Sequence, residues 1–251
     1  MKNILVIGLG EIGSALCQVI DESGKYKLFK KDKDDIKIRE DIDIMHICIP
    51  YMDNFVDIVA NYIKKYNPKL IVINSTVRPG TTKSIYDKTK KNIAHSPVRG
   101  KHPRIKEDLL LFVKFIGPVN RKAGYTAKEH FQSLGIKTEV MKSPVETELG
   151  KLFDTTYYGL CIAYHQEMER ICKKFNADFK QAVTRFNETY NDGCKISNPN
   201  VVRPVLYPGF IGGHCVMPNI VILKKIVKSD FLKAIEKSNE LKRKEEKNED
   251  S

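Results

Sequence analysis

The sequence contains no apolar run close to the roughly 20 residues that a membrane-spanning helix needs. Its start leads directly into a glycine-rich turn at Gly8 rather than into a signal-peptide pattern. The six cysteines form no CxxC pair and no regular framework, which disfavours a zinc ribbon or a disulfide-stapled fold. There is no internal repeat. We therefore expect a soluble, cytoplasmic protein with free thiols, no membrane contact and no metal.

The charged residues also indicate no particular binding partner. Lys and Arg number 43 against 31 Asp and Glu, giving a formal net charge of +12, which attracts polyanions. The lysines are scattered, however, and many stand beside acids, as in Lys31-Asp32-Lys33-Asp34. No zinc-finger, RNA-recognition or helix-turn-helix pattern is present, so nucleic acid is not an expected partner.

The first 143 residues alternate short apolar runs with segments of helical periodicity. This alternation predicts an α/β domain with a Rossmann-type parallel sheet and helices on both faces. Strands are expected at 3–7, 26–30, 44–49, 70–74, 92–95 and 112–117, and helices from the glycine turn to about 22, at 56–66 and at 123–134.

Beyond Ser143-Pro144 the pattern changes to helical spacing alone. Residues 146–175, 178–186, 219–227 and 231–240 are expected to be helical. We therefore predict an all-helical domain over 144–240, following the NAD-binding domain over 1–143. Residues 241–251 carry mostly charged side chains and are predicted to form a disordered tail.

The segment Gly8-x-Gly10-x-x-Gly13 follows a predicted strand, opens a predicted helix and precedes Asp32 by about 20 residues, which is the dinucleotide-binding context. The glycines allow a tight turn, close approach of the pyrophosphate and helix–strand packing. Asp32 favours NAD over a 2′-phosphorylated cofactor, although the lysines beside it leave the second option open. We assign the cofactor site to Gly8, Gly10, Glu11, Ile12, Gly13, Asp32, Pro50 and Thr76.

Three further segments extend this interpretation: Ser75-Thr-Val-Arg-Pro-Gly-Thr-Thr82, Glu148-Leu-Gly-Lys151 and Pro208-Gly-Phe-Ile-Gly-Gly-His-Cys215. In this order after a glycine turn, they resemble the UDP-glucose/GDP-mannose dehydrogenase family over roughly residues 1–220. The resemblance implies NAD-dependent oxidation of a sugar alcohol, in two steps to the acid, through a thiohemiacetal and a thioester on a cysteine. It also implies a homodimer built around the long helix at 151–175.

By this resemblance, Cys215 matches the nucleophile, Lys151 the lysine that stabilises an oxyanion, and Thr76 the threonine near the nicotinamide. A cation near a thiol favours the nucleophilic thiolate. We expect Lys151 near the start of a helix, whose amide groups also suit an oxyanion. Thr155 and Asn219 complete the candidate catalytic set.

The sequence departs from the family pattern at several of these positions. Ser96-Pro97-Val98 replaces Asn-Pro-Glu, Thr155 replaces an asparagine, Asn219 replaces an aspartate and Pro218 is displaced by one position. Two carboxylates that activate water are therefore missing. His95, Arg99 and His102 are the nearest polar substitutes in sequence. The chain also ends before the third, nucleotide-binding domain that family members usually have.

Three hypotheses follow from these residues. The first is an NAD-dependent oxidoreductase acting on the CH–OH group of a nucleotide sugar or related hydroxy compound. The second is a two-electron enzyme like the 3-hydroxyacid dehydrogenases, which also use a helix lysine. The third is a catalytically degenerate NAD-binding protein.

Overall fold

The computed structural model describes residues 1–34, 37–100, 103–213 and 215–249. The chain divides into two compact units, Met1–Lys151 and Leu152–Ser251. Among the described residues, no helix combines the length and apolar character needed to cross a membrane.

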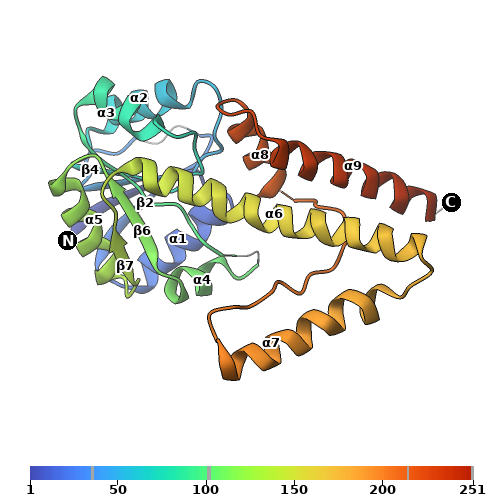
Figure 1. The fold of residues 1–251 in the computed structure, drawn as a ribbon. Helices are drawn as coiled ribbons and strands as arrows, with labels where there is room; N and C mark the ends of the chain where they lie inside the picture. The colour runs from blue at the N-terminus through green and yellow to red at the C-terminus, as the bar shows by residue number, and fades with distance from the viewer. Residues whose placement is uncertain (35–36, 101–102, 214, 250–251) are drawn as a thin grey trace. The chain divides into compact units, whose positions relative to one another are not determined.

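The first unit is built on a seven-stranded sheet of order β2-β1-β3-β4-β5-β6-β7 (Figure 1). Neighbouring strands are parallel except β5 and β6. The strands are β1 (Lys2–Ile7), β2 (Tyr26–Lys31), β3 (Ile44–Ile47), β4 (Leu70–Ile73), β5 (Asn92–His95), β6 (Lys114–Pro118) and β7 (Thr138–Val140).

Alternate residues of each central strand enter two separate cores, one on each face of the sheet. In β1, Ile4 and Val6 pack into one core, whereas Leu5 and Ile7 pack into the other. A strand buried on both faces reads as a continuous apolar run, as the sequence of β4, Leu-Ile-Val-Ile, does.

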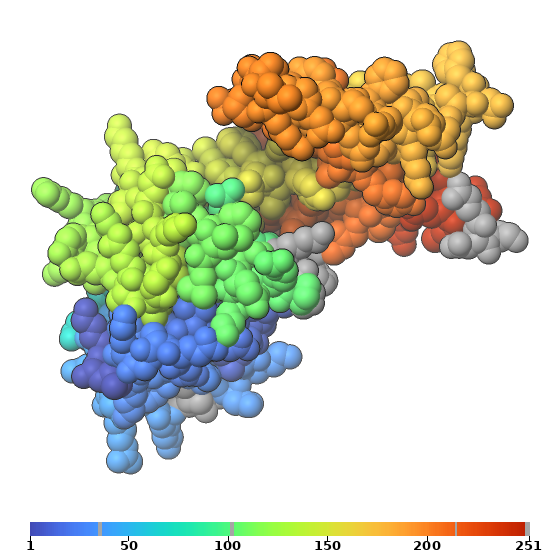
Figure 2. All heavy atoms as spheres, turned by 90° about the horizontal axis from the view of Figure 1, so that it is seen from below, coloured from blue at the N-terminus to red at the C-terminus, as the bar shows by residue number. Residues whose placement is uncertain are grey.

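Helices cover both faces (Figure 1). Residues of α1, α4 and α5 enter the core with Ile4, and residues of α2 and α3 enter the core with Leu5. Figure 2 shows α1 in blue beside α4 in green on the outer surface of this unit. These helices are α1 (Glu11–Glu22), α2 (Phe55–Tyr66), α3 (Thr81–Thr89), α4 (Ile105–Leu111) and α5 (Arg121–Ser133). The predicted Rossmann-type α/β class is thereby confirmed.

The second unit contains helices and one long irregular segment. Its core joins α6, α8 and α9 through apolar side chains that include Leu152, Ile220 and Ile235. Residues 198–215 between α7 and α8 form no helix among those described. The helices are α6 (Pro144–Lys174), which starts in the first unit, the π-helix η1 (Lys180–Thr184), α7 (Arg185–Ser197), α8 (Val216–Lys224) and α9 (Asp230–Glu249).

Buried amides hold the irregular segment where it approaches α8. Asn239 of α9 accepts a hydrogen bond from the Ile211 N–H (2.6 Å) and donates one to the Ile211 carbonyl (3.1 Å). Gln166 of α6 donates to the Gly209 carbonyl (2.8 Å) and accepts from Ser238 (2.7 Å). The backbone polar groups of a non-helical segment are thus satisfied by side chains.

The structure corrects the predicted disordered tail. The segment 241–249 continues α9, and residues 250–251 lie outside the described part. Lys242, with a side chain only 4% exposed, pairs with Glu169 of α6 at 2.7 Å. Arg170 of α6 approaches Glu245 at 3.5 Å. The charges that suggested a solvated tail instead meet opposite charges on a neighbouring helix.

Two glycines of α6 give a matched test of the packing of α6 against α8. A Cβ at Gly159 would lie 2.5 Å from Cγ1 of Val216, whereas a Cβ at Gly150 would meet nothing within 4 Å. We expect Gly159→Ala to lower the free energy of unfolding by about 1–3 kcal/mol because α8 must shift. Gly150→Ala should raise it by roughly 0.5–1 kcal/mol through helix propensity. Urea titrations measure both, and equal effects of the two changes would contradict the packing.

Candidate functional site

The carboxyl ends of five strands lie level with one another. The register pairs Ile7 with Lys31 and with Ile47, Ile47 with Ile73, and Ile73 with His95. The loops after β1 to β5 therefore emerge at one edge of the sheet. The chain leaves β1 toward β2 on one side and returns to β3 on the other, which is the switch point where such sheets bind ligands.

The glycine turn occupies this switch point, between β1 and α1. Gly8 has φ +90, and a Cβ there would lie 2.7 Å from the Cys48 carbonyl oxygen. A Cβ at Gly13 would lie 1.8 Å from the Gly8 carbonyl oxygen, so only glycine fits there. Around Gly10 a Cβ would meet nothing within 4 Å, which leaves open space at the amino end of α1. Glu11 and Ile12 form the first turn of this helix.

Asp32 connects the end of β2 to the glycine turn. Its Oδ1 accepts a hydrogen bond from the Leu9 N–H at 3.2 Å. Lys30 pairs with Asp21 at 2.6 Å, and buried Lys31 donates to the backbone carbonyls of Asp32 (3.4 Å) and Asp34 (2.7 Å). The carboxylate of Asp32 is itself exposed at the sheet edge.

The loops after β3 and β4 are joined beside Pro50 and Thr76. The Ser75 hydroxyl donates to the Ile49 carbonyl at 2.6 Å. Because Pro50 follows Ile49 and Thr76 follows Ser75, this bond brings Pro50 and Thr76 close together. Pro50 is exposed and Thr76 is half-buried. Both therefore lie at the same edge as the glycine turn.

Glu148, a residue that the sequence analysis gave no role, fixes the loop that carries Thr76. Its fully buried carboxylate accepts hydrogen bonds from the Gly80 N–H (2.7 Å), the Thr82 N–H (2.9 Å) and the Thr82 hydroxyl (2.7 Å). It thereby caps the amino end of α3. Burial raises the pKa of Glu148, although these three hydrogen bonds oppose the shift.

The adjacent Thr147 fixes the end of β5. Its hydroxyl lies 2.8 Å from Nδ1 of His95, whose Nε2 lies 3.1 Å from the Ser75 carbonyl oxygen. Burial lowers the pKa of His95 to about 3, and both of its ring nitrogens already have partners, so this histidine is too weak a base to replace the missing glutamate near pH 7. Lys151 follows one turn later. Because α6 starts at Pro144, Lys151 lies beyond its first turn. The prediction that Lys151 stands at the start of a helix, where free amide groups would also stabilise an oxyanion, is therefore wrong.

The loop 96–98 contains no carboxylate, and its Val98 is buried. The Ser96 hydroxyl donates to the Phe115 carbonyl (2.8 Å). Buried Lys114 donates to the carbonyls of Ser96 (2.8 Å) and of the following proline (3.4 Å). Arg99 stacks on Phe112 and Phe115, 5.6 Å from each ring centroid. His102 lies outside the described residues.

In the second unit, Cys215 is exposed directly before the first residue of α8. This exposure distinguishes it from Cys17 and Cys48 of the first unit, whose pKa values burial raises to about 11 and about 12. A reactive thiol needs access, and Cys215 has it. The preceding residue, His214, lies outside the described part of the chain.

Thr155 and Asn219 are brought together. The Asn219 side-chain amide donates to the Thr155 hydroxyl at 2.8 Å, and that hydroxyl donates to the Leu152 carbonyl at 3.0 Å. Both side chains are buried. The pair is neutral and supplies no carboxylate to activate water.

A second buried group lies in the core of the first unit. Nε2 of His46 lies 3.0 Å from Nε2 of His130, and Nδ1 of His46 lies 3.2 Å from the Asn74 amide. Burial lowers the pKa of His46 well below its ordinary value and that of His130 to about 3. Both rings are therefore neutral.

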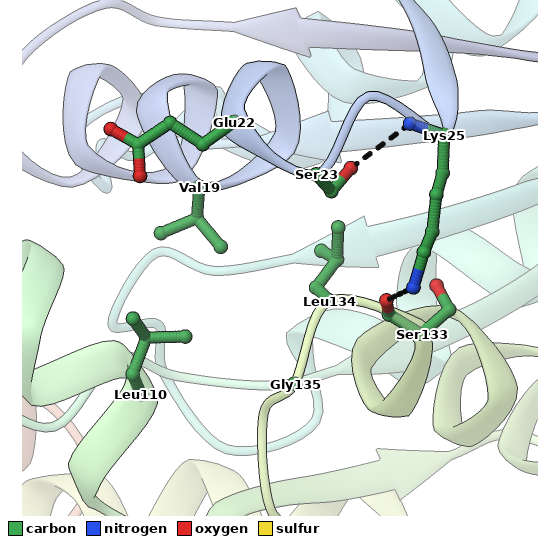
Figure 3. Close-up of a pocket in the computed structure, with 8 residues that line it drawn as sticks. All are labelled: Val19, Glu22, Ser23, Lys25, Leu110, Ser133, Leu134 and Gly135. Atoms are coloured by element: carbon green, nitrogen blue, oxygen red, sulfur yellow. Dashed lines mark hydrogen bonds between the residues drawn. The ribbon is translucent and has the colours of Figure 1, made fainter.

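A pocket of about 320 Å³ lies between the end of α1, α4 and the end of α5 (Figure 3). The end of α1 lines it with Val19 and Glu22, and Lys25 lies along one side of it and donates to the Ser133 carbonyl at 2.5 Å. None of the residues that line it is a candidate site residue. Among the described residues, no cluster of three or more His, Cys, Asp or Glu side chains suits a metal.

Comparisons with known proteins identify the family and the fold of this chain. Residues 145–241 match the central domain of the UDP-glucose/GDP-mannose dehydrogenase family. The UDP-N-acetyl-D-mannosamine dehydrogenase of Methanococcus maripaludis is 30% identical over 197 residues, which cover 76% of this chain and 43% of that protein. The chain thus spans less than half the length of this relative.

Solved structures share the fold. A UDP-D-ManNAc dehydrogenase from Pyrococcus horikoshii has a TM-score of 0.81 at 20% identity, covering 95% of this chain and 68% of that one. A 3-hydroxyisobutyrate dehydrogenase from Mycobacterium tuberculosis has a TM-score of 0.69 at 11% identity, covering 97% and 93%. At these identities, the likeness concerns the fold alone.

The three buried neutral histidines predict acid sensitivity. The pKa of each is lower in the folded chain than the ordinary value near 6.5, so the unfolded chain binds protons first as the pH falls. Their contribution is complete above about pH 6.5 and is lost toward about pH 3, by up to roughly 1.4 kcal/mol per pH unit for each histidine. Urea titrations of the natural chain and of His130→Leu measure this loss. A slope that His130→Leu leaves unchanged would contradict the assignment.

The Glu148 cap gives another test. Glu148→Ala strands two backbone N–H groups and a hydroxyl, so the free energy of unfolding should fall by about 3 kcal/mol, and by less in Glu148→Gln. Glu146→Ala is the matched control, because this exposed carboxylate in the same turn bonds no described residue other than Ser143. Equal losses in Glu148→Ala and Glu146→Ala would refute the cap.

Proposed function

Since this chain belongs to the UDP-glucose/GDP-mannose dehydrogenase family, of which it carries the central domain, we propose that it is an NAD-dependent oxidoreductase. Its substrate is a nucleotide sugar or a related hydroxy compound, and the group that it oxidises is a CH–OH group. The observation that carries this proposal is the glycine turn at the switch point of the sheet, with Asp32 bonded beside it.

The first unit fits NAD. The open space at Gly10 and the amino end of α1 suit a pyrophosphate, and the exposed Asp32 suits the hydroxyls of the adenosine ribose. Lys30 pairs with Asp21 and Lys31 donates to the backbone carbonyls of Asp32 and Asp34, so a 2′-phosphate would meet the Asp32 carboxylate. This favours NAD over NADP. Gly8, Gly13, Glu11, Ile12, Pro50 and Thr76 complete the proposed cofactor site.

The proposed chemistry divides among three side chains, with NAD supplying the hydride acceptor when bound. Lys151 stabilises the oxyanion that forms as the substrate hydroxyl loses its proton. Thr76 contacts the nicotinamide end of the cofactor. In a second oxidation, the Cys215 thiolate adds to the carbonyl carbon of the aldehyde.

A specific observation favours a single, two-electron oxidation as the second candidate function. Val98 is buried and the Thr155–Asn219 pair is neutral, so neither position supplies a carboxylate for thioester hydrolysis. A two-electron reaction, as in 3-hydroxyacid dehydrogenases, needs Lys151 but not Cys215. The third alternative, a degenerate NAD-binding protein, requires neither.

We also propose a cytoplasmic homodimer. Exposed aromatic side chains recur along α6 at Phe153, Tyr157, Tyr164 and Phe175. A row of this kind on one helix suits burial against a second copy of the chain.

The test is NADH formation with UDP-N-acetyl-D-mannosamine, UDP-glucose, GDP-mannose and small 3-hydroxyacids. Lys151→Ala should lower turnover by about 100-fold or more. Cys215→Ser should abolish only the second oxidation, whereas Cys194→Ser, the control in α7, should change nothing. Two NADH and an acid per substrate support two oxidations, and one NADH and a carbonyl support one. Unchanged turnover in both site variants would refute the site, and NAD binding without turnover on any substrate would favour the degenerate protein.

A further inference from the structure

Lys114 is a buried lysine without an anionic partner among the residues that the structure describes. Lys114 is the first residue of β6 and is only 4% exposed. Its ammonium nitrogen lies 4.9 Å from the centroid of the Phe131 ring. Its hydrogen bonds go to the carbonyls of Ser96 and Pro97. Within the described parts of the chain, no carboxylate forms an ion pair with it. Buried charges are normally paired, because leaving water costs several kcal/mol.

Lys114 lies at the same edge of the sheet as the glycine turn, because β6 runs antiparallel to β5 and Lys114 bonds the carbonyls that directly follow β5. Cys48, directly after β3, interacts electrostatically with Lys114. The Cys48 carbonyl oxygen occupies the space beside Gly8, 2.7 Å from where a Cβ would be, and the Cys48 Cβ lies 3.3 Å from the corresponding point at Gly13. Lys114 and the turn on which the dinucleotide phosphates are expected therefore share one edge of the sheet, with Cys48 beside the turn.

We propose that Lys114 is the internal counter-charge of the bound dinucleotide, so that its protonated form strengthens binding and binding itself takes up a proton at Nζ. The proton comes from the buffer, and no bond in the cofactor changes. The inference rests on the proposed NAD site. It assigns to that site a pH-dependent affinity, carried by a residue that does not touch the cofactor.

The buried histidines and Cys48 near Lys114 have pKa values far from neutral pH. The titratable groups facing it are Cys48 after β3, His46 of β3, His95 of β5, His130 of α5 and Lys151 of α6. Burial lowers the pKa of Lys114 to about 7; Cys48 opposes this shift and the charge of Lys151 adds to it. The pKa values of His95 and His130 are about 3 and that of Cys48 is about 12. Protons gained near neutral pH are thus assigned to Lys114.

Calorimetric titration with NAD tests the proposal. Repeating the titration in buffers of different ionisation enthalpy counts the protons taken up on binding. The natural chain should take up a fraction of a proton per NAD at neutral pH, and its affinity should fall roughly threefold or more from about pH 6.5 to about pH 8.5. Lys114→Met should bind weakly at both pH values without uptake. Lys114→Arg should bind with uniform affinity, because arginine stays charged.

Lys69→Met is the control, since it removes an exposed lysine at the other edge of the sheet and should behave as the natural chain does. NAD binding by the natural chain without proton uptake and with uniform affinity would overturn the inference and leave the cofactor site standing. Uptake that persists in Lys114→Met would also overturn it. Failure of the natural chain to bind NAD would overturn the proposed function and this inference together. Because uptake is measured on the natural chain, the test does not depend on the folding of any variant.

Discussion

The contact between Gly13 and the Gly8 carbonyl is the constraint on which the first unit depends. A Cβ at Gly13 would lie 1.8 Å from that oxygen, so any other residue would push α1 away from β1. The close approach sets the amino end of α1 over the end of β1 and leaves open space at Gly10. This open space, at the edge where five strands end level with one another, is the proposed position of the dinucleotide phosphates.

The first turns of α6 hold the rest of that edge together. Thr147 contacts the end of β5 through His95, and Glu148 binds the loop that carries Thr76. Lys151 follows one turn later on the same helix. Two loops and the proposed catalytic lysine are therefore positioned by neighbouring residues, and a change in this turn acts on several parts of the site.

The strands β1 to β6 and the glycine turn were predictable from sequence, because buried strands are short apolar runs and the turn requires glycine at fixed positions. The three-residue strand β7 was not predicted, since its side chains are mostly exposed. The α3 and α4 helices were not predicted, since α3 is short and largely polar and α4 has seven residues. Glu148 and Lys114 look like surface residues in a sequence rich in charge. Their burial follows from contacts with residues far away in the chain, which periodicity does not encode. The same holds for Lys242, which lies in the segment predicted to be a disordered tail but pairs with Glu169 of α6 as part of α9.

A crystal structure of the chain with NAD tests the central claim most directly. The account predicts pyrophosphate oxygens within hydrogen-bonding distance of the backbone amides around Gly10 and the adenosine ribose hydroxyls on the Asp32 carboxylate. The nicotinamide half should extend over the loops that carry Pro50 and Thr76. NAD bound elsewhere, or with its adenosine ribose away from Asp32, would contradict the account.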